Sequence, residues 1–168
     1  VGNTRIKAAV FEQNTLLEIF IFQKENFSKE LEFILKQFPK ITKIAVASVG
    51  DVEKIDFLAF EKEIEIVFID HKSKFPFKNL YKTPNTLGID RMVLTTGAVL
   101  QFPKKNRLVI DAGTCVTYDY VDENDNYLGG AISPGIRLRY ESLHQFTAKL
   151  PLLSKAEPKN SIGNLTNE

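Results

Sequence analysis

The strongest constraint on the fold of this chain is a strand pattern that occurs twice. Residues 108–126, LVIDAGTCVTYDYVDENDN, run apolar into Asp-Ala-Gly-Thr, resume as an alternating strand and reach a polar turn. The first 22 residues show the same order, with a Gly and a Thr close together, an alternating strand, a polar turn and another strand. Because this alternation predicts short strands joined by tight turns, we expect a three-stranded meander at the head of each half of the chain.

Between the two copies, segments with helical periodicity alternate with short apolar runs. The segment FSKELEFILKQF has apolar residues at helical spacing, which predicts a helix capped by Ser28 and ended by Pro39. The runs KIAVASV and EIEIVFID predict strands, and DVEKIDFLAFEK between them predicts a weaker helix. Strands that alternate with helices favour parallel crossover connections.

A stretch of about twenty residues with little periodicity follows, HKSKFPFKNLYKTPNTLGIDR at 71–91. Loops of this length are unusual in compact domains unless they have a function. The next segment, RMVLTTGAVLQF, is almost entirely apolar and predicts an interior helix that begins at Met92 and ends before Pro103. We therefore expect a functional loop that leads into a buried helix.

Composition narrows the class of protein. The chain has 168 residues, 43% of them hydrophobic and 26% charged, which suits one or two small globular domains. Its 22 basic and 21 acidic residues are interspersed, which argues against a nucleic-acid or anionic-lipid partner. No apolar run approaches the length of a membrane span. We expect a cytoplasmic protein.

Several residue types offer no chemistry of their own. The single cysteine, Cys115, cannot form an internal disulfide, and we expect it to be buried in a strand. His71 and His144 have no partner at ligand spacing, so no zinc site is expected. The Gly-x-x-x-x-Gly-Lys-Ser/Thr loop of Walker-type kinases does not occur.

The Gly/Thr turns could bind phosphate. Glycine lets the backbone approach a ligand, while successive N–H groups and a threonine hydroxyl can hold phosphate oxygens. A carboxylate at a strand end, such as Asp111, can hold a cation. If the two turns face each other across a cleft, phosphate and metal would meet there. The alternative is that Asp-Ala-Gly-Thr is only a hairpin turn.

Asp90 and Arg91 at the end of the long loop also permit two interpretations. A carboxylate at the mouth of a helix can orient a hydroxyl and accept its proton in a phosphoryl transfer. Alternatively, Asp90 only caps the helix that begins at Met92, and Arg91 only pairs with a neighbouring acid. Both interpretations of Asp90 can hold, because a capping position is a rigid place for a base.

Six motifs in order give the chain a family resemblance over all 168 residues. They are VGNTRIK (1–7), TLGIDR (86–91), DAGT (111–114), GGAISPGI (129–136), TAKLP (147–151) and SIGNLT (161–166). In these motifs the chain resembles the type III pantothenate kinases of the acetate and sugar kinase/Hsc70/actin superfamily. The resemblance implies an α/β fold of duplicated, actin-like (ribonuclease H-like) mixed-sheet domains. Residues 1–104 would form the first half with the acceptor loop, and residues 105–168 the start of a truncated second half.

The resemblance also implies a function. The family transfers the γ-phosphate of ATP to pantothenate, which gives 4'-phosphopantothenate and begins coenzyme A biosynthesis, and it works as a cytoplasmic homodimer. A non-catalytic nucleotide-binding regulator on the same fold and another small-molecule kinase of the superfamily remain alternatives. Asp90, Asp111 and Thr114 together favour the enzyme.

The roles of individual residues follow from the matching positions. Asp90 resembles the general base, and Asp111 the ligand of a monovalent cation, K⁺ or NH₄⁺. ATP would arrive with Mg²⁺. The substrate-binding residues would be Tyr81, Gly88, Ile89, Asp90, Arg91 and Thr166. The ATP-binding residues would be Val1, Gly2, Asn3, Thr4, Arg5, Ile6, Lys7 and Thr114.

Some of these assignments have structural alternatives. Tyr81 could be a loop aromatic packed on the core, and Thr166, which in the family reaches pantothenate at the dimer interface, could be a helix start. The family has an aspartate just before its first turn and continues after the last motif. We expect both segments to be missing from this chain, before Val1 and after Glu168.

Overall fold

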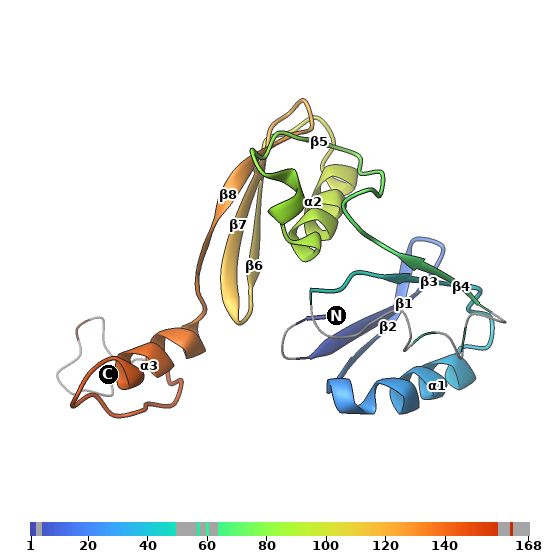
Figure 1. Cartoon of the computed structure of the whole chain (residues 1–168). Helices are drawn as coiled ribbons and strands as arrows, with labels where there is room; N and C mark the ends of the chain where they lie inside the picture. Colours follow the sequence, from blue (N-terminus) through green and yellow to red (C-terminus); the bar gives the residue numbers. More distant parts are fainter. Residues whose placement is uncertain (3–4, 50–56, 58–59, 61–63, 158–161, 163–168) are drawn as a thin grey trace.

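The computed structural model describes residues 1–2, 5–49, 57, 60, 64–157 and 162, and the fold is mixed α/β (Figure 1). The strands are β1 (Ile6–Glu12), β2 (Thr15–Phe22), β3 (Lys43–Val46), β4 (Glu65–Phe68), β5 (Lys78–Asn79), β6 (Arg107–Ala112), β7 (Cys115–Val121) and β8 (Asn126–Pro134). The helices are α1 (Phe27–Gln37), α2 (Ile89–Gln101) and α3 (Ile136–Gln145), with short 3₁₀ turns η1 (Lys24–Asn26) and η3 (Pro84–Thr86). Among the described residues, no helix is both long enough and apolar enough to cross a membrane.

The first strand pattern forms a hairpin rather than a meander. Strands β1 and β2 pair antiparallel in a two-stranded sheet, and Gln13 takes the left-handed conformation in their turn (φ 55°). The prediction of three strands was therefore wrong for this segment. The described residues before β1, Val1 and Gly2, belong to no strand.

Helix α1 confirms the predicted amphipathic helix, but its start differs from the expectation. The turn η1 runs directly into it, so the N-cap residue is Asn26 and Ser28 lies inside the first turn. Ser28 was therefore wrongly predicted as the cap. The helix ends at Gln37, two residues before Pro39, as expected.

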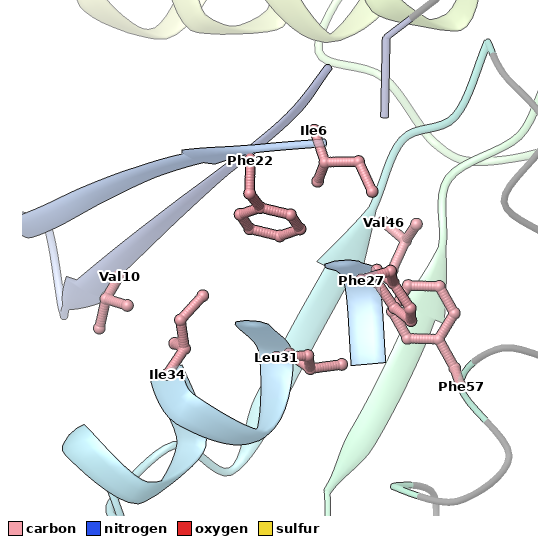
Figure 2. Packing of buried hydrophobic residues seen from close by; sticks show 8 residues of the cluster. All are labelled: Ile6, Val10, Phe22, Phe27, Leu31, Ile34, Val46 and Phe57. Carbon is pink, nitrogen blue, oxygen red and sulfur yellow. The ribbon is translucent and has the colours of Figure 1, made fainter. Parts of the chain in front are cut away.

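Strands β3 and β4 confirm the predicted parallel pair. The helix predicted over DVEKIDFLAFEK lies mostly outside the described residues. Figure 2 shows how the first core forms: Phe22 of the hairpin, Leu31 of α1 and Val46 of β3 point toward one another, with Phe57 beside them. Burial of such side chains contributes about 1.5–3 kcal/mol each. This core fixes the hairpin, α1 and the parallel pair as one unit.

The second strand pattern forms the predicted meander. Strands β6, β7 and β8 pair antiparallel in sequence order, and β5 adds to β8 in parallel. The register places Asp111 opposite Thr117 and Val109 opposite Asp119. Because side chains alternate between the faces of a sheet, these four residues share one face. Asp119 and Val121, also on that face, are fully buried.

Helix α2 covers this face, but it begins earlier than expected. Its first residue is Ile89 and its N-cap is Gly88, so the predicted start at Met92 was wrong by a turn. Met92, Thr95 and Val99 are buried, whereas Leu100 is 68% exposed. The helix is therefore half-buried rather than interior. It ends before Pro103, as expected.

The second core lies between α2, the long loop and the sheet. It consists of Phe77, Leu87, Ile89, Met92, Val99, Val121 and Tyr127. The loop itself is mostly irregular, as predicted, and is interrupted only by β5 and η3 within the described residues. Packing of its aromatic residues against Tyr127 attaches the loop to the sheet. Helix α3 follows β8 and extends away from the sheet (Figure 1).

Candidate active site

Asp90 lies in the first turn of α2 with its side chain exposed. Its Oδ1 atom accepts a hydrogen bond of 2.8 Å from the backbone N–H of Arg91. A Cβ atom at Gly88 would lie only 2.4 Å from this oxygen, so a glycine is needed beside the carboxylate. The N-cap residue is Gly88, so Asp90 lies inside the first turn and not at the predicted cap before Met92; its carboxylate nevertheless satisfies one first-turn N–H, that of Arg91.

Arg91 points in the opposite direction, into the protein. It is 6% exposed, and its Nε atom donates a 2.9 Å hydrogen bond to Oδ1 of the fully buried Asp119 on β7. This confirms the alternative in which Arg91 pairs with an acid. Burial lowers the pKa of Arg91, but the hydrogen bond and charge of Asp119 raise it, and the net pKa lies above its ordinary value. Arg91 is therefore a permanent cation in this site.

Tyr81 packs against the same buried cluster. Its ring meets the ring of Tyr127 edge to face, with centroids 6.3 Å apart. The backbone N–H of Tyr81 donates to Oδ1 of Asn79 at 2.9 Å, which holds the loop beside β5. The predicted packing of Tyr81 on the core is confirmed, while its half-buried side chain still reaches the surface.

The loop is also attached to the start of α2. Nε2 of His71 donates a 2.8 Å hydrogen bond to the carbonyl of Leu87. Beneath the loop lies a pocket of about 230 Å³. It is lined by His71, Ser73, Phe75, Phe77, Asn79, Pro84, Asn85 and Met92. Ile89, another predicted substrate-binding residue, is buried in the second core.

The start of the chain lies beside β3 and near Asp90. The backbone N–H of Val49 donates to the carbonyl of Val1 at 3.1 Å. The Asp90 carboxylate lies within electrostatic reach of the backbone nitrogen of Val1. The predicted first phosphate element therefore begins near the predicted base.

The predicted ATP residues of the first turn have different environments. Arg5 and Lys7 are exposed, whereas Ile6 is buried in the first core and can offer only its backbone to a ligand. The N–H of Gly2 already donates to the carbonyl of Arg5 at 3.2 Å. Asn3 and Thr4 lie outside the described residues, as does Thr166.

The second turn is closed by a glycine from a distant motif. The N–H of Gly135 donates to the carbonyl of Thr114 at 3.0 Å. A Cβ atom at Gly135 would lie 2.3 Å from the carbonyl oxygen of Gly113 and 2.5 Å from that of Thr114. The GGAISPGI motif thus allows α3 to begin directly against the Asp-Ala-Gly-Thr turn. Cys115 is exposed rather than buried, because it lies at the edge of this turn.

Asp111 lies opposite a threonine whose hydroxyl has no hydrogen-bond partner among the described residues. It is half-buried on β6, opposite Thr117, and Oγ1 of Thr117 is buried and makes no hydrogen bond with the described residues. Side chains of directly opposed residues come within about 5 Å. A carboxylate and a hydroxyl are hard oxygen donors that suit a monovalent or divalent cation. The pair therefore fits the predicted cation site.

Asp111, Thr117 and Asp119 lie on the same face of the sheet. The pair of Asp111 and Thr117 lies two residues along the strands, about 7 Å, from the pair of Val109 and Asp119. Thr114 is farther, since it lies five positions before Asp119 along the chain, a span of about 16 Å in extended backbone. No group of three His, Cys, Asp or Glu side chains suited to a metal occurs in the described part of the chain. We therefore assign no Mg²⁺ ligands among the described residues.

Sequence reasoning missed residues that hold the site together, chiefly Asp119, Tyr127 and Gly135. One signal for Asp119 was available, because it is a charged residue at an inward position of the alternating strand TYDYV. The role of Gly135 depends on contact between segments 21 residues apart, and no local pattern reports such a contact.

Comparison with known proteins identifies the family. The family model for type III pantothenate kinase matches residues 1–168. The chain is 63% identical to a type III pantothenate kinase of Flavobacterium johnsoniae over 166 residues, covering 99% of this chain and 68% of that protein. It is 61% identical to the Flavobacterium psychrophilum type III pantothenate kinase, covering 100% of this chain and 70% of that one.

One solved structure, of a Campylobacter jejuni protein described as a Baf family transcriptional activator, matches with a TM-score of 0.49 and 25% identity. That match covers 95% of this chain and 66% of the other. The two Flavobacterium relatives and the family model agree over the whole chain. The chain belongs to the type III pantothenate kinase family, and it is a pantothenate kinase.

Proposed function

We propose that the chain phosphorylates pantothenate with Asp90 as the general base. The observation that carries this assignment is the geometry of Asp90: an exposed carboxylate at a helix N-terminus, held by the N–H of Arg91, beside a glycine that leaves it room. A carboxylate held in this way can accept a proton without first reorienting. The reaction begins coenzyme A biosynthesis.

In this reaction the protein itself takes part in little covalent chemistry. Asp90 accepts the proton of the primary hydroxyl of pantothenate as that oxygen forms a bond to the γ-phosphorus of ATP, and the bond between this phosphorus and ADP breaks. The products are 4'-phosphopantothenate, ADP and a proton. General-base catalysis of this kind contributes about 10²- to 10⁴-fold, and positioning supplies much of the rest.

The remaining residues bind and orient the substrates in this proposal. Tyr81, Gly88, Ile89 and Arg91 shape the acceptor site, and Thr166 completes it from the partner subunit of a homodimer. Val1, Gly2, Asn3, Thr4, Arg5, Ile6 and Lys7 form the first phosphate element, with Thr114 in the second. Gly135, which closes the turn of Thr114, supports the latter assignment.

Two cations accompany the nucleotide in this proposal. Asp111 and Thr117 would hold a monovalent cation, K⁺ or NH₄⁺, because the carboxylate lies opposite a buried hydroxyl without a partner. When bound, the cations neutralise phosphate charge; Mg²⁺ would enter with ATP.

The architecture proposed for this chemistry is that of the actin-like kinases. Residues 1–104 would form the first half and residues 105–168 the start of the second, in a cytoplasmic protein. The recurrence of a hairpin at the head of both segments supports the duplication, although only the second extends to a third strand.

The test is ATP-dependent phosphorylation of pantothenate by the full-length protein beside Asp90→Asn, with and without K⁺. We expect Asp90→Asn to lower kcat by at least about 100-fold while circular dichroism shows a folded protein. Removal of K⁺ should lower turnover of the unchanged protein. A folded Asp90→Asn that keeps its kcat would show that another group accepts the proton.

A further inference from the structure

Asp119 is the most completely buried charge in the second core. Its side chain is 0% exposed on β7, beneath the start of α2. A buried carboxylate is costly unless it is paired, and a buried ion pair adds little net stability compared with apolar packing. A role in holding nearby groups in place would account for its presence.

All the hydrogen bonds described for this carboxylate are accepted by one of its oxygens, Oδ1. Oδ1 of Asp119 accepts hydrogen bonds from Nε of Arg91 at 2.9 Å and from the hydroxyl of Tyr127 at 2.6 Å. Nη2 of Arg91 lies 2.6 Å from the same oxygen. Charge-assisted bonds of this kind are short and directional. The positions of the arginine and the tyrosine are therefore set by a single atom.

The two hydrogen-bond donors to Asp119, Arg91 and Tyr127, each contact a different residue of the proposed acceptor site. Arg91 is the chain neighbour of Asp90, and its backbone N–H holds the Asp90 carboxylate. The ring of Tyr127 supports the ring of Tyr81, and it also lies 5.9 Å from the ring of Phe77 in the same loop. Movement of Asp119 would thus reach both Asp90 and Tyr81.

A glycine on the neighbouring strand makes room for this arrangement. A Cβ atom at Gly130 would lie 2.8 Å from Nη2 of Arg91 and 1.8 Å from the carbonyl of Tyr118. The absence of a side chain at Gly130 on β8 therefore lets the guanidinium of Arg91 approach the sheet closely. Two glycines of the motif GGAISPGI thus have separate roles: Gly130 makes room for Arg91, and Gly135 makes room for the turn of Gly113 and Thr114.

We propose that Asp119, acting through Arg91 and Tyr127, is the positioning residue that holds the pantothenate site in its binding geometry. The inference rests on the proposed acceptor residues. Asp119 touches neither substrate; it determines where Arg91 and Tyr81 lie. It therefore acts on pantothenate binding and leaves ATP binding to the phosphate turns.

The test compares Asp119→Asn with Tyr127→Phe in the full-length protein, below the unfolding temperature of each variant. The first variant removes the charge and the second removes one donor without changing the packing. We expect the KM for pantothenate to rise at least about tenfold in Asp119→Asn, which weakens every hydrogen bond to the carboxylate, and about threefold in Tyr127→Phe, which removes one of these bonds and leaves those of Arg91. The KM for ATP should stay within about twofold, a split that general loosening of the fold would not produce.

Asp125→Asn is the matched control. Asp125 accepts a 2.8 Å hydrogen bond from Nη1 of Arg107. Like Arg91, Arg107 is buried, but it lies on β6 of the sheet. Its φ of 61° is one that asparagine tolerates. This control should leave both KM values unchanged.

Three results would overturn the proposal: an unchanged pantothenate KM in folded Asp119→Asn, equal rises for ATP and pantothenate, or the same rise in Asp125→Asn. If Asp119→Asn does not fold, an unchanged pantothenate KM in Tyr127→Phe has the same meaning. Asp90→Asn is measured in parallel. Retained turnover in that variant would refute the proposed base and leave the positioning test intact.

Discussion

At the scale of single residues, the site depends on two glycines, because a side chain at either position would meet a residue of the site. Gly88 and Gly130 lie on opposite sides of Asp90 and Arg91, and a Cβ atom at either would meet the side chain of one of them. The sequence identified Gly88 through its motif. It could not show that the reason is a distance of 2.4 Å to a carboxylate oxygen, because that distance depends on the rotamer of Asp90.

Gly88→Ala should therefore impair catalysis more than folding. The added methyl group displaces the Asp90 carboxylate, so we expect kcat to fall at least about tenfold, in line with the sensitivity of catalysis to misplaced groups. The melting temperature should fall only modestly: glycine is preferred to alanine at an N-cap, but the backbone at Gly88 (φ −57°, ψ 135°) is one that alanine adopts without strain. Steady-state kinetics and thermal unfolding measure the two effects.

Gly97→Ala in the same helix is the control. A Cβ atom at Gly97 meets nothing within 4 Å, so the change should stabilise the helix by up to about 1 kcal/mol and leave kcat intact. Equal losses of kcat in both variants would mean that any alanine in α2 disturbs the site and that the contact with Asp90 is irrelevant.

At the scale of elements, the local patterns were predictable and the contacts between elements were not. Helix α1, the parallel pair β3 and β4, and the meander β6 to β8 follow from periodicity in a single segment. The start of α2 was misplaced because Gly88 carries no capping side chain to mark it. The pair of Arg91 and Asp119 spans 28 residues, so only the folded packing of α2 on the sheet brings them together.

Contact between β8, α3 and the second phosphate turn gives a prediction at this scale. Gly135→Ala places a methyl group 2.3 Å and 2.5 Å from two backbone oxygens of the turn, and backbone cannot move aside as a flexible side chain can. We expect the turn to shift and the KM for ATP to rise at least about tenfold, while the KM for pantothenate stays within about twofold. Initial-rate kinetics with each substrate varied in turn would check this, and a rise confined to pantothenate would contradict the assignment of the turn to phosphate.

At the scale of the whole molecule, two separate cores stabilise the structure. The first joins the hairpin, α1 and the parallel pair, and the second joins α2, the long loop and the meander sheet. Tyr127 is the fully buried aromatic residue of the second core. Burial and the hydrogen bond to Asp119 raise its pKa above the ordinary value of 10.0.

This shift predicts a loss of stability in alkali. Below pH 10 the tyrosine is neutral in both the folded and the unfolded chain, so its contribution is fully present. Above pH 10 the unfolded chain releases the proton and the folded chain retains it, so the free energy of unfolding falls as pH rises, by up to about 1.4 kcal/mol per pH unit for this one group. Urea unfolding followed by circular dichroism between about pH 9 and 11.5 would measure the slope.

Tyr127→Phe removes this group and leaves the other tyrosines and the lysines as they are. We therefore expect a shallower decline of stability above pH 10 in the variant. Parallel curves for the two proteins would show that Tyr127 ionises as easily in the folded state as in the unfolded chain.

The shared oxygen of Asp119 has a consequence for anyone who would redesign this enzyme to accept a different alcohol. Replacements at Tyr81 and Arg91 cannot be chosen independently, because both residues are supported through that one atom, and their effects should be strongly non-additive. A library that varies them one at a time would sample mostly damaged sites. Tyr81 and Arg91 should therefore be varied together with Asp119 and Tyr127, because hydrogen bonds and ring contacts couple these four residues.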